Sequence, residues 1–195
     1  MKPVGILYAT RQGQTKRIAD YLESALDAQG LHVESRNLRY TPSTIWLDGY
    51  SAVILAASVR LGRHEPEMIR FVKDHLAELG RMPAAFLSVS LSQAGVELPG
   101  ATFQQRSAAA ASVQKVLQKF FAGTGWRPKR VKAVAGALLY TKYNFLVRFV
   151  MKRIALKAGG STDTSRDHEY TNWALLDWFA DGFAKELYRQ RSAGA

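Results

Sequence analysis

Apolar positions along this chain gather in short runs, separated by longer stretches in which they recur at helical spacing. The short runs predict strands at residues 4–9, 31–38, 50–58, 83–91 and 131–140. The longer stretches predict helices at residues 15–30, 66–79, 105–123 and 172–190. The third run, YSAVILAAS, is apolar almost throughout, which is typical of a parallel strand covered on both faces. The alternation therefore predicts an α/β fold, with a five-stranded parallel sheet and helices on both of its faces.

One segment, residues 141–170, does not follow this alternation. It lies between the fifth predicted strand and the last helix, and it is too long for a simple connection in a compact domain. A chain of 195 residues is most economically one domain. We therefore expect a single domain over residues 1–195, with an insertion at about 141–170 that has a role of its own.

The first predicted strand leads into the helix through the loop TRQGQT, residues 10–15. Such a loop is where open α/β sheets hold phosphate, because the backbone N–H groups at a helix N-terminus face the anion. The loop holds one glycine, Gly13, so neither the dinucleotide pattern nor the P-loop pattern is present. Thr10, Gly13 and Thr15 offer hydroxyls and amides to a terminal phosphate monoester, and Arg11 could add charge. An ordinary strand-to-helix turn has the same pattern, so the loop alone leaves both interpretations open.

The net charge of +11 is concentrated in one part of the chain. Residues 98–162 contain twelve Lys and Arg but no Asp or Glu, while the rest of the chain holds 15 basic and 16 acidic residues. This imbalance favours an anionic partner: a membrane surface, nucleic acid or an acidic small molecule. A merely solubilising surface is the alternative.

The absence of cysteine excludes disulfides, thiolate catalysis and cysteine metal sites, and we expect no metal site of another kind. It also agrees with a cytoplasmic location. The first apolar run is too short for a secretory signal, and no stretch approaches the roughly 18–20 apolar residues of a spanning helix. We therefore expect a soluble or peripheral protein.

The stretch ILYATRQGQTKRIA resembles the opening of flavodoxin-like proteins, in which the equivalent loop holds the phosphate of FMN. Two further loops, AASVRLGRHEP and SVSLSQAG, follow the third and fourth predicted strands, where the other flavin loops are expected. More specific matches are ATRQGQT, ASVRLG, GWRPKRVKAVAGALLY and KAGGSTDT followed by YTNW. Together they resemble the bacterial quinone-dependent protoporphyrinogen oxidases of the flavodoxin superfamily, over nearly the whole chain.

The resemblance implies a flavodoxin-like sheet with strand order 2-1-3-4-5 and FMN as the cofactor. It also implies that three loops contact the flavin. The candidate residues are Thr10, Arg11, Gln12, Gly13, Gln14 and Thr15 in the first loop, Ser58, Val59, Arg60, Leu61 and Gly62 in the second, and Ser90 and Leu91 in the third.

The activity that the resemblance implies is FMN-dependent oxidation of protoporphyrinogen to protoporphyrin in haem biosynthesis. FMN would accept a hydride equivalent at N5 in each of three cycles and pass the electrons to a membrane quinone. Because the flavin performs the redox chemistry, we predict no residue as general acid or base. His64 lies on a flavin loop and is the one candidate for a chemical role, with a structural role as the alternative.

Two other functions compete with this one. The first is a flavodoxin-type electron carrier that oxidises no substrate of its own. The second is a nucleic-acid-binding protein, but no nucleic-acid module is recognisable, so we expect no nucleic-acid partner.

Residues 143–160, YNFLVRFVMKRIALKAGG, have the length of a helix inside the predicted insertion. On a helical wheel, two basic ridges separate two apolar faces, one of which includes Phe145 and Phe149. One face could pack on the protein while the other meets a membrane or a second subunit. The candidate membrane and quinone-side residues are Phe145, Arg148, Phe149, Lys152, Arg153 and Lys157. We expect a protein on the cytoplasmic face of the bacterial inner membrane; the alternatives for this helix are a core helix with incidental charges and a homo-oligomer contact.

Overall fold

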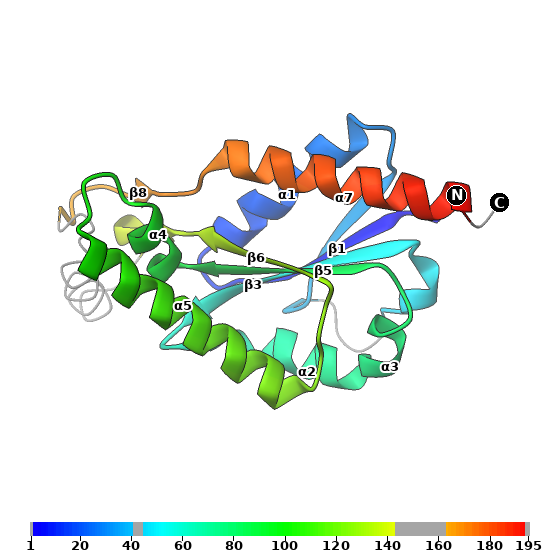
Figure 1. The fold of residues 1–195 in the computed structure, drawn as a ribbon, viewed down its shortest axis with the longest axis horizontal. Helices are drawn as coiled ribbons and strands as arrows, with labels where there is room; N and C mark the ends of the chain where they lie inside the picture. The colour runs from blue at the N-terminus through cyan, green and yellow to red at the C-terminus, as the bar shows by residue number, and fades with distance from the viewer. Residues whose placement is uncertain (1, 41–44, 143–162, 194–195) are drawn as a thin grey trace.

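Five parallel strands form the centre of the structure, a computed structural model that describes residues 2–40, 45–142 and 163–193 (Figure 1). The strands are β1 (Val4–Ala9), β2 (Val33–Asn37), β3 (Ala52–Arg60), β5 (Ala84–Ser90) and β6 (Arg130–Ala135). Their order in the sheet is β2-β1-β3-β5-β6. Counted along the chain, these five strands have the order 2-1-3-4-5, so the predicted sheet is confirmed.

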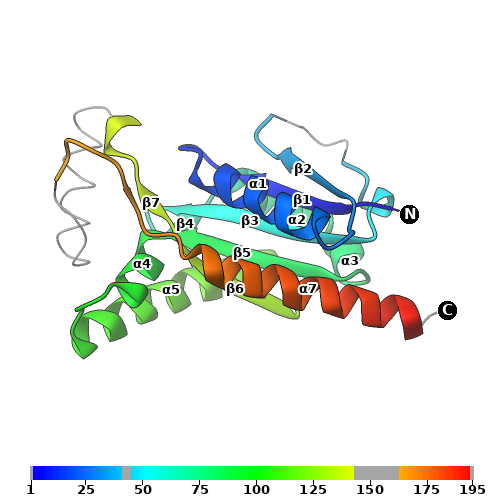
Figure 2. The same cartoon turned by 90° about the horizontal axis from the view of Figure 1, so that it is seen from above.

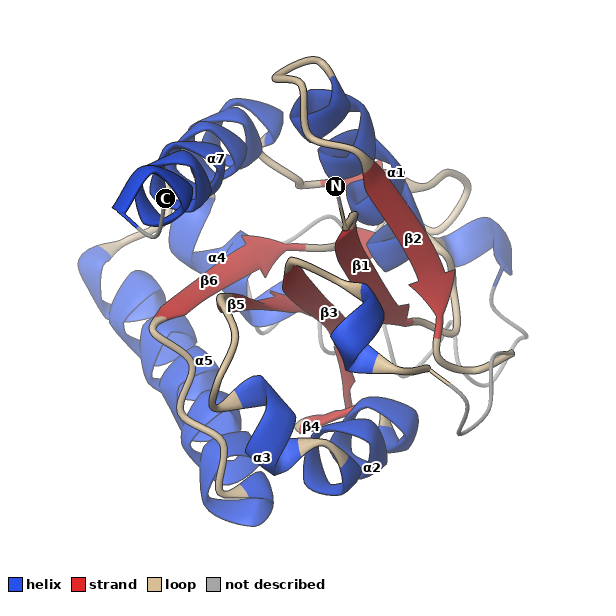
Figure 3. Ribbon diagram, turned by 90° about the vertical axis from the view of Figure 1, so that its right-hand side faces the viewer, coloured by secondary structure: helices blue, strands red, loops and turns tan. Residues whose placement is uncertain are grey.

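Helices cover both faces of this sheet (Figures 2 and 3). One face is covered by α1 (Gln14–Asp27) and α7 (Trp173–Ala193). The other face is covered by α2 (Pro66–Asp74), α3 (Leu76–Leu79) and α5 (Phe103–Thr124). Two single 3-10 turns lie at Leu47–Gly49 and Tyr140–Lys142.

The alternation of side chains along the central strands explains why β1 and most of β3 are apolar. Ile6 and Ile54 belong to the core under α1 and α7, whereas Leu7 and Leu55 belong to the core on the opposite face. All four side chains are fully buried. A strand between two helical layers has no solvent-facing side, so its sequence cannot show the polar alternation of a half-exposed strand.

The segment after β3 differs from the predicted loop, because it forms a tight hairpin. The chain turns at Leu61 and Gly62, with φ of 49° and 70°, and returns as β4 (Arg63–His64), antiparallel to β3. Positive φ at two successive residues is the geometry of a two-residue hairpin turn. The helix predicted at 66–79 then divides at His75 into α2 and α3.

The segment after β5 also differs from its prediction as a loop, because it contains α4 (Leu91–Glu97). Ser90 caps this helix, since its Oγ accepts a hydrogen bond of 3.2 Å from the N–H of Gln93. The strand predicted at 131–140 ends at Ala135, and after Gly136 the chain forms β7 (Ala137–Leu138). This short strand pairs antiparallel with β8 (His168–Glu169), which leads to α7.

Most of the predicted insertion lies outside the described residues, including Phe145, Arg148, Phe149, Lys152, Arg153 and Lys157. Its two described ends meet, because Asp167 Oδ1 accepts hydrogen bonds of 2.9 Å from both the N–H and the hydroxyl of Thr141. Among residues 2–40, 45–142 and 163–193, no helix is both long enough and apolar enough to cross a membrane.

Candidate functional site

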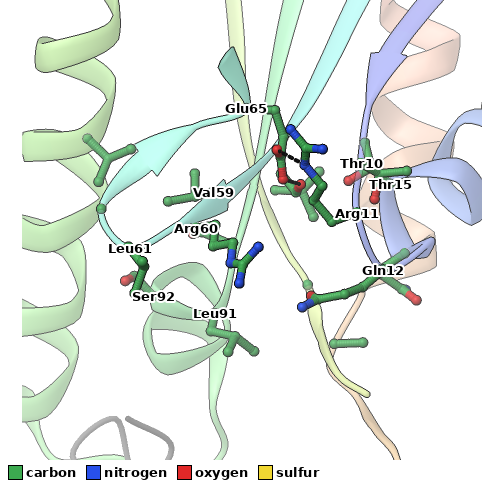
Figure 4. Close-up of a pocket in the computed structure, with 18 of the residues that line it drawn as sticks. Thr10, Arg11, Gln12, Thr15, Val59, Arg60, Leu61, Glu65, Leu91 and Ser92 are labelled. Atoms are coloured by element: carbon green, nitrogen blue, oxygen red, sulfur yellow. Dashed lines mark hydrogen bonds and ion pairs between the residues drawn. The ribbon is translucent and has the colours of Figure 1, made fainter. Parts of the chain in front are cut away.

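A cavity of about 740 Å³ lies where the parallel strands end, at their carboxyl edge (Figure 4). This is the edge at which open α/β sheets bind ligands, and the volume falls within the roughly 300–1,000 Å³ of small-molecule sites. Residues from all three predicted flavin loops line it. They are Thr10, Arg11, Gln12, Gln14 and Thr15, then Ser58, Val59, Arg60, Leu61 and Gly62, and finally Ser90 and Leu91. Gly13 is the one predicted contact that is not part of the lining.

The loop before α1 has the geometry of an anion cradle. Gly13 lies in the left-handed region with φ of 99° and begins α1 without a side-chain cap. Its N–H donates to Thr10 Oγ1 at 3.2 Å, which closes the loop. Thr15 is fully buried, and its hydroxyl has no hydrogen-bond partner among the described residues. An uncapped helix N-terminus beside an unpaired buried hydroxyl fits a phosphate monoester, which would accept hydrogen bonds from both.

Gln14 connects this cradle to the chain that precedes α7. Its side-chain N–H group donates to Glu169 at 2.6 Å and to Thr171 at 2.9 Å. Thr171 in turn donates to the carbonyl of Ala135, at the end of β6. These contacts hold the first turn of α1 against the segment that precedes α7 and, through it, against the end of β6.

Arg11 crosses from the first loop to the second (Figure 4). Its Nε donates to Glu65 at 2.8 Å, and its Nη2 donates to Glu67 at 2.6 Å. The Glu65 carboxylate is buried and also accepts a hydrogen bond of 2.9 Å from Ser58. The hydrogen bond to Glu65 raises the pKa of Arg11. Because two carboxylates compensate the guanidinium, the geometry gives Arg11 the role of a strut between loops, whereas the sequence suggested a charge for the phosphate.

Sequence reasoning missed Glu65, although it lines the cavity. The one local signal was Pro66, which favours the first position of a helix and thereby places Glu65 at the N-cap. Nothing in the local pattern indicates that this carboxylate faces a loop more than fifty positions earlier.

His64 is buried and is not among the residues that line the cavity. Its Nε2 is 2.8 Å from Ser88 Oγ, and its ring packs edge-on against Phe86 and Phe120. Burial lowers the pKa of His64 to about 4, so the imidazole is neutral at pH 7. These contacts describe a structural histidine, and we assign it no part in the chemistry.

The opposite wall of the cavity comes from α5 and was not predicted. Its residues Ser112, Lys115, Val116 and Lys119 line the cavity. Their spacing places them on one face of the helix, next to the face that carries the buried Val113, Leu117 and Phe120. The sequence predicted this segment as a helix and counted its lysines among the basic residues that favour an anionic partner, but it did not place them at the cavity.

The fold and the cavity are those of a flavodoxin-like protein, and residues 5–165 match the family model described as a flavodoxin domain. Protoporphyrinogen IX dehydrogenase (quinone) of Escherichia coli K12 is 37% identical to this chain over 175 residues, covering 90% of this chain and 91% of that protein. A Leishmania major protein of the same name is 34% identical over 180 residues, covering 92% of this chain and 73% of that protein. This chain belongs to that family of flavodoxin-domain proteins, and the predicted resemblance is confirmed.

Solved structures agree at the level of the fold. Rubredoxin oxygen:oxidoreductase of Desulfovibrio gigas superposes with a TM-score of 0.51 over 97% of this chain, at 13% sequence identity. The chain spans 37% of that larger protein. At this identity the similarity supports the flavodoxin-like fold and no particular activity.

Proposed function

We propose that this chain is an FMN-dependent dehydrogenase that oxidises protoporphyrinogen IX to protoporphyrin IX and transfers the electrons to a quinone. The observation that carries the proposal is the match, over nine-tenths of the chain, to relatives named for this activity. The cavity supports it independently, because it combines an anion cradle with an open, partly apolar space at the same sheet edge.

FMN, when bound, supplies the two-electron redox chemistry, and the protein binds and orients it. Gly13 and the first-turn amides of α1 would hold the phosphate, with the hydroxyl of Thr15 as a further donor. The hairpin residues Ser58–Gly62 and the start of α4 would bracket the ring system. Ser90 contributes mainly through its backbone, because its hydroxyl caps α4.

The Arg11–Glu65–Ser58 contacts would fix the distance between the first two loops. Glu65 and Ser58 are joined a second time, since the N–H of Glu65 donates to the carbonyl of Ser58 at 3.2 Å. Such a bridge positions both loops before the flavin arrives, which reduces the entropy lost on binding. No proton transfer is assigned to Glu65, because its two carboxylate oxygens are engaged by Ser58 and Arg11.

We further propose that the protein works at an anionic membrane surface, on the cytoplasmic face of the bacterial inner membrane. A quinone dissolves in the bilayer, so an enzyme that reduces it gains from residing there. The acid-free segment 98–162 supports this location, at about 1 kcal/mol for each Lys or Arg near an anionic surface. The residues named for this contact, Phe145 to Lys157, and the alternative of a homo-oligomer contact both belong to the part of the chain outside the described residues.

The test is anaerobic stopped-flow spectroscopy of the purified protein with protoporphyrinogen. We expect rapid bleaching of the flavin absorbance by the porphyrinogen and its recovery when a quinone is added. A flavin that exchanges electrons quickly with a reductase but is not reduced by the porphyrinogen would assign the protein instead as an electron carrier.

A further inference from the structure

Three cations that line the cavity have no carboxylate partner among the described residues. Lys115 and Lys119 come from α5, and Arg60 comes from the end of β3. None of the ion pairs formed within the described part of the chain includes them. Arg60 extends from the hairpin into the space between the second loop and the first (Figure 4). The positive charge of these three side chains is therefore available to a ligand.

The fold fixes where the two lysine side chains begin. Val113 and Leu117 anchor α5 in the core, so the neighbouring helix face is held toward the cavity. Lys115 and Lys119 are four residues apart on that face, or about 6 Å along the helix axis. Both lysines are exposed, and no Asp or Glu occurs between positions 98 and 162 to compete for them.

The two lysines on α5 lie apart from the phosphate cradle. Helix α1, which carries the cradle, packs on one face of the sheet, and α5 packs on the other. The cavity lies across the sheet edge between them, so an anion at Gly13 and an anion at Lys119 occupy different ends of one site. The lining also includes the apolar side chains of Leu91, Val116 and Leu139.

We propose that Lys115, Lys119 and Arg60 form a carboxylate-binding subsite that holds the propionate groups of the porphyrinogen. This inference rests on the proposed function, because it concerns that substrate. A porphyrinogen is an uncharged macrocycle that carries its propionates on two neighbouring pyrroles, so its charge lies along one edge. The two lysines, one helical turn apart, and the guanidinium offer positive charge to these groups, since each carboxylate can accept charge-assisted hydrogen bonds. The apolar lining residues would contact the macrocycle.

The experiment is an equilibrium titration of the full-length, FMN-loaded protein with protoporphyrin IX and, separately, with its dimethyl ester, followed by the porphyrin absorbance. The Lys115→Met/Lys119→Met double variant should bind the diacid about 10-fold to 100-fold more weakly and bind the ester like the unaltered protein. Met keeps the length and apolar stem of Lys without its charge. Lys115→Arg/Lys119→Arg should recover most of the affinity for the diacid.

Lys129→Met is the matched control, because Lys129 is exposed in the same acid-free segment and does not line the cavity. The subsite is overturned if the unaltered protein binds the ester as tightly as the diacid. It is also overturned if the double variant keeps its affinity for the diacid but loses binding to phosphatidylglycerol vesicles that Lys129→Met retains, because the lysines would then contact a membrane. Failure of the proposed function has a different signature: porphyrin diacids bind through the lysines, yet protoporphyrinogen does not reduce the flavin.

Discussion

At the α1 end of the cavity, the cation nearest the ligand space, Arg11, is paired with two carboxylates, whereas at the α5 end Lys115 and Lys119 face the cavity with no such pair among the described residues. The first end presents fixed groups: an uncapped helix N-terminus and the buried hydroxyl of Thr15, which under the proposed function would hold the phosphate. The second end relies on long, hydrated side chains that start from a rigid helix.

The difference corresponds to two kinds of ligand group. A cofactor that stays bound benefits from a preorganised cradle, whose donors lose little entropy when the phosphate arrives. A substrate that enters and leaves at each turnover is better served by exposed lysines, whose attraction acts over several ångströms and which release the product readily. Four predictions test which groups of the fixed end bind a ligand and which stabilise the fold, from the largest expected effect to the smallest.

Gly13→Val should weaken FMN binding by at least about a hundredfold, because a β-branched residue is strained at φ of 99° and would obstruct the cradle. The measurement is quenching of FMN fluorescence on titration with apoprotein. Gly100→Val is the matched control, since Gly100 also has a positive φ, 80°, but lies between α4 and α5 and not in the loop before α1. Equal loss of FMN affinity in both variants would contradict the assignment of the cradle.

His64 should make the protein less stable in acid without affecting the cavity. Folding holds the pKa of His64 at about 4, below its ordinary value of 6.5. Between these values the unfolded chain binds a proton that the folded protein does not, so stability falls as the pH drops from 6.5 to 4. The loss amounts to about 3 kcal/mol for this group. Urea unfolding at several pH values should show that the free energy of unfolding falls less steeply with decreasing pH in His64→Gln than in the unaltered protein. The same pH dependence in both proteins would refute this account.

Arg11→Met should lower the free energy of unfolding by about 2 kcal/mol, because it leaves the buried carboxylate of Glu65 without its cation. The estimate is reduced from that of a fully buried pair, since the Arg11 side chain is 29% exposed. Adding Glu65→Gln should restore most of the stability. If Arg11 instead supplied charge to the phosphate, the single variant would lose FMN affinity far more than stability, and the second substitution would not compensate.

Thr15→Val should have opposite effects on the two states of the protein. Without FMN the variant should be more stable by about 1 kcal/mol, because it removes a buried hydroxyl that has no partner in the described structure. FMN binding should weaken about tenfold, because one phosphate donor is lost. Thr15→Ser, which keeps the hydroxyl, is the control. A Thr15→Val apoprotein that is less stable than the unaltered one would mean that the hydroxyl already has a partner.

The strands and the main helices followed from local patterns, and the places where prediction failed have a common cause. Among the elements missed, β4, β7 and β8 are two residues long and α4 is seven residues long. Segments of this length show no periodicity of their own. The hairpin depends on the conformation at Leu61 and Gly62, and α4 depends on its cap at Ser90 and on packing against its neighbours.

The candidate site divides in the same way. The sequence indicated the loop at 10–15 because a glycine-bearing strand-to-helix loop has a chemistry of its own. It did not indicate that Glu65 and the two lysines of α5 belong to the site, because the relevance of those residues comes from what lies opposite them. Lys115 and Lys119 have the pattern of an exposed helix face, and it is the end of β3 and the cavity that make them part of a site.

The sequence by itself predicted the alternation of strands and helices and singled out the loop at 10–15, since each of these patterns lies within one element or one turn of the chain. Only the tertiary structure decided that Arg11 serves Glu65 and that His64 is buried. It also decided which face of α5 closes the cavity. The physical reason is that parallel crossovers bring together strand ends that are more than fifty residues apart, and the partners they create at that edge leave no periodic trace in the chain.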